Sequence, residues 1–149
     1  MSYKRYILFS LIIALPGALI NVKNILYANS VSVVNIISTL LFIAAWMVYG
    51  FYAGYNKAKS FLIFNFIFWS LNLGLTIIHS IKDIDFLYIF TIYTSFVPMY
   101  GLYYFITHSN MASRLVGYCL LIITPLTCSI LGYLMGLMKY NLNFKRKES

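Results

Sequence analysis

Polar side chains recur along one apolar stretch in the middle of the chain. Five of them follow one another at spacings of four, three, four and three residues, namely Asn65, Trp69, Asn72, Thr76 and His79. These spacings place all five on one face of an α-helix, and we call this set the polar stripe. Polar groups cost free energy in hydrocarbon, so the stripe should face other helices or a wet cavity. Two interpretations stay open: hydrogen bonds that join helices, which we favour, or a binding groove or permeation path.

The residues that could carry acid–base or metal chemistry are few and far apart. The acids are Asp83 and Asp85 in a predicted loop and Glu148 near the end of the chain. His79 and His108 end consecutive apolar runs, so we expect them on opposite membrane faces, about 25–30 Å apart. His79 and Asp83 could meet as a base and its orienting carboxylate, but no nucleophile accompanies them. We therefore predict that the protein is not an enzyme and binds no metal and no cofactor.

Small residues at intervals of four form a second pattern, which favours close packing of helices. The residues that we assign to helix packing are Gly50, Gly54, Cys128, Gly132 and Gly136. The two cysteines, Cys119 and Cys128, are nine residues apart in one apolar run. At about 100° per residue they fall on opposite helix faces, so they cannot pair with each other. We interpret both as small packing residues between helices.

The composition indicates the medium in which these residues lie. The chain has 149 residues, of which 62% are hydrophobic, 19% aromatic and only 9% charged. A soluble domain carries about 25% charged residues, which cover its surface. The outside of this fold should therefore face lipid.

Five apolar runs predict one all-α, polytopic membrane domain over residues 1–149. The predicted transmembrane helices cover 6–22, 31–54, 61–81, 86–106 and 115–138, and a basic tail, 139–149, should fray. At about 1.5 Å per residue, the run 61–81 reaches about 32 Å, which matches a bilayer core. The runs are too long for barrel strands and lack their alternation. Pro16 and Gly17 should kink the first helix or break it into a re-entrant hairpin.

The basic residues lie mainly between the apolar runs and in the tail. This distribution is typical of charges that set membrane topology, whereas a nucleic-acid surface gathers Lys and Arg into one stripe. Five crossings divide the 11 basic residues into five and six, and a re-entrant first run divides them into eight and three. We retain five crossings, which predict loops 55–60 and 108–114 on the same side, and leave the orientation open.

Two functions fit these observations. The leading hypothesis is a small non-enzymatic protein that acts by lateral contact in the bilayer, as an immunity-type protector or an accessory or regulatory subunit. Its partners would be the lipid bilayer and another membrane protein or a homo-oligomer, but no nucleic acid. The alternative is a small oligomeric carrier or flippase for an uncharged solute, whose path follows the polar stripe. The bias toward Ile, Asn, Lys and Tyr favours a low-GC bacterium, hence a bacterial inner or cytoplasmic membrane.

Overall fold

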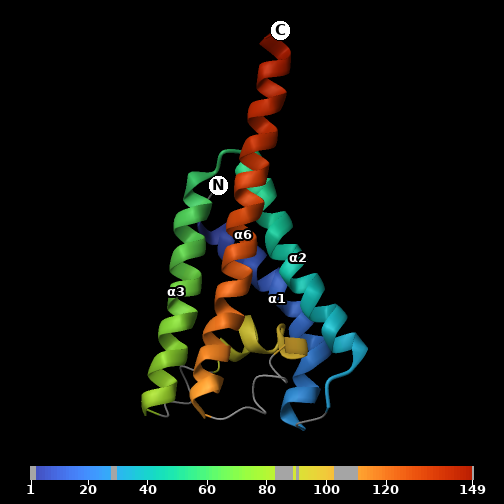
Figure 1. Cartoon of the computed structure of the whole chain (residues 1–149), viewed down its shortest axis with the longest axis vertical. Coiled ribbons are helices and arrows are strands. Elements are labelled where there is room, and N and C mark those ends of the chain that lie inside the picture. Colours follow the sequence, from blue (N-terminus) through green and yellow to red (C-terminus); the bar gives the residue numbers. More distant parts are fainter. Residues whose placement is uncertain (1–2, 28–29, 83–88, 90, 103–110, 149) are drawn as a thin grey trace.

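Every described element of the structure is helical (Figure 1). The computed structural model describes residues 3–27, 30–82, 89, 91–102 and 111–148. Its elements are α1 (Tyr3–Leu26), α2 (Val33–Tyr55), α3 (Lys59–Lys82), the π-helix η1 (Ile92–Phe96) and α6 (Met111–Glu148). In this part of the chain 4 helices, α1, α2, α3 and α6, are long and apolar enough to cross a membrane. The prediction of an all-helical membrane bundle is confirmed, with four candidate spans described where five were expected.

The first helix, α1, is continuous through the proline that was expected to bend or interrupt it. Pro16 lies inside α1, and the stretch Lys4–Asn24 of this helix is a candidate span. The re-entrant alternative for the first run is therefore wrong. Proline removes one N–H from the helix ladder, but membrane helices tolerate this loss where neighbouring elements support the backbone. Such support is present at Gly17, where an added β-carbon would come within 3.0 Å of Pro98 Cα.

Local hydrogen bonds and one side-chain contact fix the ends of α2. Ser32 and Asn35 form a capping box, in which Ser32 N–H donates to Asn35 Oδ1 (2.7 Å) and Asn35 N–H donates to Ser32 Oγ (3.4 Å). These bonds satisfy backbone donors that a helix start leaves unpaired. Just after the other end, Lys57 adopts a left-handed backbone with φ of 52°. Its ammonium lies 3.8 Å from the centre of the Tyr140 ring, which holds this turn against α6.

The first three helices run antiparallel in sequence order. Tyr6 near the start of α1 contacts Tyr49 near the end of α2, with ring centres 6.5 Å apart. At the other end of the pair, Asn35 Nδ2 donates to Asn21 Oδ1 at 2.7 Å. The short turn 56–58 then returns the chain into α3, which makes α2 and α3 antiparallel neighbours.

The last helix, α6, is antiparallel to α3 and parallel to α2. Asn65 of α3 donates to Ser129 of α6, and this contact lies beside the α2 helix. Gly50 of α2 faces the backbone of Ser129, and Gly54 faces the backbone of Tyr133. The residue numbers therefore rise in the same direction along α2 and α6. Small residues on both helices allow this close backbone approach.

The fourth apolar run, 86–106, is described only at 89 and 91–102, where it is not a regular α-helix. Val97 N–H donates to the carbonyl of Ile92 at 2.8 Å, the five-residue step of a π-helix. Pro98 follows at once and lacks the N–H that a continuing α-helix would need. Figure 1 shows η1 lying across the end of the bundle at which α3 ends and α6 begins.

Two loops that were expected on one side of the membrane lie at opposite ends of the bundle. The turn 56–58 follows α2, whereas Met111–Arg114 form the first turn of α6 at the other end (Figure 1). Residues 108–110 lie outside the described part of the chain. The expectation of a common side for 55–60 and 108–114 is therefore wrong over the described residues. It required run 86–106 to carry the chain across the membrane, but α6 begins at the end where α3 stops.

Aromatic side chains fill the interior, and aliphatic side chains cover the outside. The fully buried residues include Tyr6, Trp46, Phe61 and Trp69, which come from three different helices. Trp46 and Trp69 meet edge to face with ring centres 5.0 Å apart. Large aliphatic residues are exposed along all four candidate spans, as at Leu19 (68%). An apolar exterior of this extent fits contact with lipid.

The helix α6 is longer than a bilayer core. Its 38 residues reach about 57 Å at 1.5 Å per residue, about twice the 30 Å of the hydrocarbon. Its final turns project beyond the other helices (Figure 1). The tail 139–149, which was expected to fray, is helical as far as Glu148.

Candidate functional site

The polar stripe lies inside the helical bundle. Its described side chains are at most 1% exposed: Asn65, Trp69, Asn72 and Thr76. The backbone of His79 belongs to α3, but its side chain lies outside the described part of the chain, as do Asp83 and His108. The stripe faces α6 and the segment around η1. Its polar atoms are available to a ligand only where they are not already hydrogen-bonded to other helices.

Asn72 is the centre of the hydrogen bonds in the stripe. Its Oδ1 accepts from Thr94 Oγ1 at 2.7 Å and from Ser95 Oγ at 3.0 Å. Its Nδ2 donates to the carbonyl of Phe68 at 2.9 Å, and its own carbonyl accepts from Thr76 Oγ1 at 2.9 Å. One amide thus joins α3 to η1, which the sequence places 20 residues or more later. This is the helix-joining arrangement that membrane bundles use.

Asn65 joins α3 to α6 in a similar way. Its Nδ2 donates to Ser129 Oγ at 2.8 Å, and that hydroxyl donates to the carbonyl of Leu126 at 2.7 Å. Among the described residues, Asn65 Oδ1 and the indole N–H groups of Trp46 and Trp69 have no hydrogen-bond partner. Buried groups of this kind cost stability, so this part of the core is not optimised for stability alone.

The described stripe offers amides, a hydroxyl and an indole. These groups donate and accept hydrogen bonds, but none is a strong acid, base or activated nucleophile. Among the residues that the structure describes, no group of three or more His, Cys, Asp or Glu side chains could hold a metal ion. What the arrangement can do chemically is hold helices together.

A second polar cluster, which the sequence analysis missed, joins α1 to α2 and α2 to the η1 segment. Asn21 Nδ2 donates to Ser38 Oγ (3.4 Å) and its Oδ1 accepts from Asn35. Thr39 Oγ1 donates to the carbonyl of Pro98 (3.2 Å) and accepts from the N–H of Gly101 (3.0 Å). The spacing of Asn35, Ser38 and Thr39 is the same three-or-four pattern that revealed the polar stripe. That pattern could have revealed this cluster too.

The predicted packing glycines face each other across α2 and α6. A β-carbon added at Gly50 or Gly54 would overlap the carbonyl oxygen of Ser129 or Tyr133 on α6. One added at Gly132 or Gly136 would overlap the carbonyl oxygen of Met47 or Phe51 on α2. The other residue of this predicted set, Cys128, is a half-buried free thiol, and Ser129 beside it forms the backbone contact. Cys119 is likewise free.

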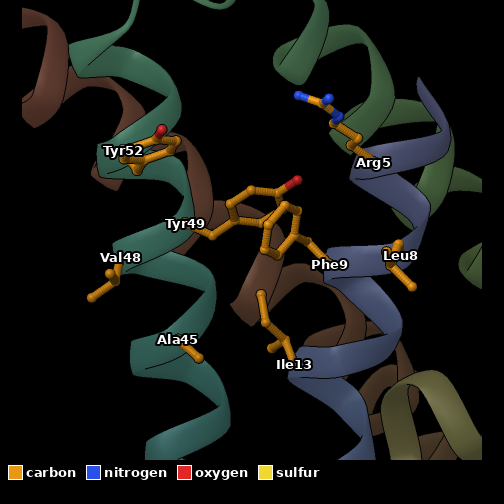
Figure 2. Close-up of a pocket in the computed structure, with 8 residues that line it drawn as sticks. All are labelled: Arg5, Leu8, Phe9, Ile13, Ala45, Val48, Tyr49 and Tyr52. Carbon is orange, nitrogen blue, oxygen red and sulfur yellow. The ribbon is translucent and has the colours of Figure 1, made fainter. Parts of the chain in front are cut away.

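A cavity lies between α1 and α2, away from the polar stripe. It measures about 780 Å³ and is lined by Arg5, Leu8, Phe9, Ile13, Ala45, Val48, Tyr49 and Tyr52 (Figure 2). A second pocket of about 340 Å³ shares Ile13 and Ala45 with it and continues as far as Ile20 and Ser38. None of the described stripe residues lines either pocket.

The burial of Asn72 leads to a first prediction. In a chain whose Cys119 and Cys128 are replaced by serine, the Asn72→Cys variant should not react with a hydrophilic maleimide in intact membranes. The position is fully buried, and no water path along the stripe is needed to explain its contacts. Cysteine labelling followed by a gel shift measures the reaction.

Controls make this labelling result interpretable. Lys57→Cys, in an exposed turn, should react, and Leu71→Cys and Leu73→Cys on other faces of α3 should not. A reactive Asn72→Cys variant between silent neighbours would contradict the helix-joining role and favour a water-filled path.

Comparison with known proteins adds no relative from which a role could be carried over. No protein-family model, no curated protein and no solved structure matches this chain.

Proposed function

We propose that this chain is a non-enzymatic, multi-pass membrane protein that acts by lateral contact with another membrane protein. The observation that carries the proposal is an exposed apolar face of α6 that continues to near the end of its candidate span. It consists of Leu131 (54% exposed), Met135 (45%), Met138 (57%) and Leu142 (60%), and we call it the α6 seam.

The spacing of the α6 seam suits a partner helix. Its residues follow at intervals of four, three and four, the repeat by which two helices pack along each other. Lipid suffices to cover the part of the seam inside the bilayer. Leu142 follows Lys139 and Tyr140 near the end of the 29-residue candidate span Val116–Phe144, and Tyr140 already contacts Lys57 in the turn after α2. An exposed apolar side chain at such a position favours a protein partner over lipid.

The alternative, a carrier whose path follows the polar stripe, has less support. A path needs polar groups that a solute can reach, whereas the described stripe groups are buried and bonded to other helices. We therefore prefer the lateral-contact function. The role would be that of an immunity-type protector or of an accessory or regulatory subunit.

The distribution of basic residues supports four crossings with both termini on the cytoplasmic side. In this arrangement the run 86–106 returns to the side from which it starts. One end of the bundle then carries eight of the 11 basic residues: Lys4, Arg5, Lys57, Lys59, Lys139, Lys145, Arg146 and Lys147. The other end carries three: Lys23, Lys82 and Arg114. The positive-inside rule assigns the richer end to the cytoplasm. A bacterial cytoplasmic membrane is the location we propose.

Site-specific photo-crosslinking tests the lateral contact. A photoreactive amino acid at Leu142 should give an adduct of discrete mass in cells, and one at Leu40 should not. Leu40 is a suitable control because it is 59% exposed, like Leu142 at 60%, but lies on α2. Immunoblotting and mass spectrometry of the adduct identify what is bound.

The outcomes of this experiment separate the candidates. Loss of the adduct on Met138→Glu, with unchanged expression, would support the α6 seam as the contact. An adduct of twice the chain mass would show that the partner is another copy of this chain and not a different protein. No protein adduct at Leu142 would contradict the proposal.

A further inference from the structure

We propose that the groove between α1 and α2 binds one anionic glycerophospholipid, with its phosphate at Arg5 and an acyl chain along the apolar walls. The groove comprises the two neighbouring pockets between these helices, which share Ile13 and Ala45. This inference concerns a different face of the bundle from the α6 seam, so it does not depend on the proposed lateral contact; it uses only the proposed orientation of the termini.

The groove is polar at one end and apolar along the rest of its length. Figure 2 shows Arg5 of α1 and Tyr52 of α2 on opposite walls at the same end of the pocket. Toward the other end the walls are formed by Ile13 and Ala45, and the rings of Phe9 and Tyr49 lie between the two helices in the middle of the pocket, with Leu8 and Val48 at its edges. A phospholipid has the same division, with one charged head and long hydrocarbon tails.

The position of Arg5 suits the headgroup of a lipid. Arg5 lies in the first turn of α1, where the helix reaches the membrane surface, and Lys4 precedes it. Neither α1 nor α2 contains Asp or Glu, so no carboxylate of the two walls competes for the guanidinium. Arginine binds phosphate through two parallel N–H donors, and the Tyr52 hydroxyl on the facing wall can donate as well. The cytoplasmic leaflet, to which the positive-inside rule assigns this end, is the one rich in anionic lipid.

The dimensions of the groove suit one acyl chain. From Arg5 to Ile13 the helix rises about 12 Å, and from Arg5 to Ile20 about 22 Å. One leaflet of hydrocarbon is about 15 Å deep, so a chain that starts at Arg5 ends within the second pocket. The pocket of about 780 Å³ is also in the usual size range of small-molecule sites.

The packing of α1 against α2 explains why the groove is open. The two helices are joined near one end by Asn21 and Asn35 and near the other by the rings of Phe9 and Tyr49, 5.6 Å apart. Between these points Ala45 of α2, which has one of the smallest side chains, lines both pockets. A large side chain at this position should fill the groove without changing the contacts at either end.

Native mass spectrometry of the full chain, purified in detergent and titrated with palmitoyl-oleoyl-phosphatidylglycerol, tests the proposal. We expect one tightly bound lipid per chain. Ala45→Phe should weaken its binding by about tenfold or more, because the side chain occupies the volume of the acyl chain. Arg5→Gln should also weaken it by about tenfold, the usual worth of a charge-assisted phosphate contact. Dioleoylglycerol, which has tails but no phosphate, should not compete.

Matched variants distinguish this site from general effects on the membrane surface. Ala44→Phe adds the same ring one residue away, on an exposed face of α2, and Lys59→Gln removes an exposed cation at the same end of the bundle. Both should bind the lipid like the unaltered chain. If Ala45→Phe misfolds, Leu8→Trp tests the groove from the opposite wall, with Leu11→Trp as its control. Unchanged binding in Ala45→Phe or Leu8→Trp, or equal losses in the controls, would overturn the proposal.

Discussion

Replacing Gly54 with isoleucine is expected to separate α2 from α6 and to destabilise the bundle more than any other change considered. A β-carbon at this position would overlap the backbone carbonyl of Tyr133, and a backbone group cannot move aside by changing rotamer. Overpacking of a core costs about 1–3 kcal/mol and occasionally more. We expect a loss of about 3 kcal/mol, which lowers the melting temperature of a chain of this size by about 10 °C. Thermal unfolding in detergent, followed by circular dichroism, measures the change.

Gly74→Ile is the matched control for this experiment. Gly74 lies within α3, and among the residues that the structure describes no atom lies within 4 Å of an added β-carbon. The intrinsic helix propensity changes equally at the two positions, so the difference between the variants reports the contact between α2 and α6. Equal melting temperatures for Gly54→Ile and Gly74→Ile would show that α2 and α6 are not packed against each other in this way.

The second large effect is expected for Asn35→Leu, which removes several hydrogen bonds at once. Asn35 Oδ1 accepts from the Ser32 backbone at 2.7 Å and from its hydroxyl at 2.6 Å, and Nδ2 donates to Asn21 at 2.7 Å. Loss of a helix cap costs about 1 kcal/mol, and an interhelical hydrogen bond in a membrane protein contributes about 0.6 kcal/mol. We expect a total of about 2 kcal/mol, since Asn21 then stays buried with one bond fewer.

The helix cap and the interhelical bond can be separated by two further variants. Ser32→Ala removes only the side-chain part of the cap, and Asn21→Leu removes only the link to α1. Asn141→Leu, at an exposed position of α6, should leave the melting temperature unchanged. If Asn35→Leu melts like Asn141→Leu, the cluster at Asn21 does not hold α1 against α2.

The sequence by itself determined that the outside of the fold faces lipid and that long helices form. Hydropathy and run length are local properties, and a backbone in hydrocarbon must satisfy its hydrogen bonds within each segment. The runs that became α1, α2, α3 and α6 were therefore readable from the chain. The same argument predicted that Asn72 and Thr76 are buried, because period and polarity indicate that a face is covered.

The sequence did not reveal at which proline a helix is interrupted. Pro16 and Pro98 both lie in apolar runs, and the interruption was assigned to the first. In the structure, α1 passes through Pro16, and an irregular segment with a π-helix precedes Pro98. The cost of a missing N–H is similar at both sites. What differs is the surroundings of the two prolines. The backbone beside Pro16 is supported at Gly17, which packs on Pro98. At Pro98 it is the carbonyl that is bonded, and it accepts from Thr39.

The partners of each covered face were decided only by the tertiary structure. The small-residue intervals at Gly50 and Gly132 predicted close packing, but not that these two faces meet or that α2 and α6 run parallel. Likewise, no spacing rule connects Asn72 to Thr94 or Asn65 to Ser129. Periodicity specifies which side of a helix is buried, whereas the choice of neighbour depends on how all the helices pack at once. The groove beside Arg5 arises in the same way, because it is the space that two joined helices leave between them.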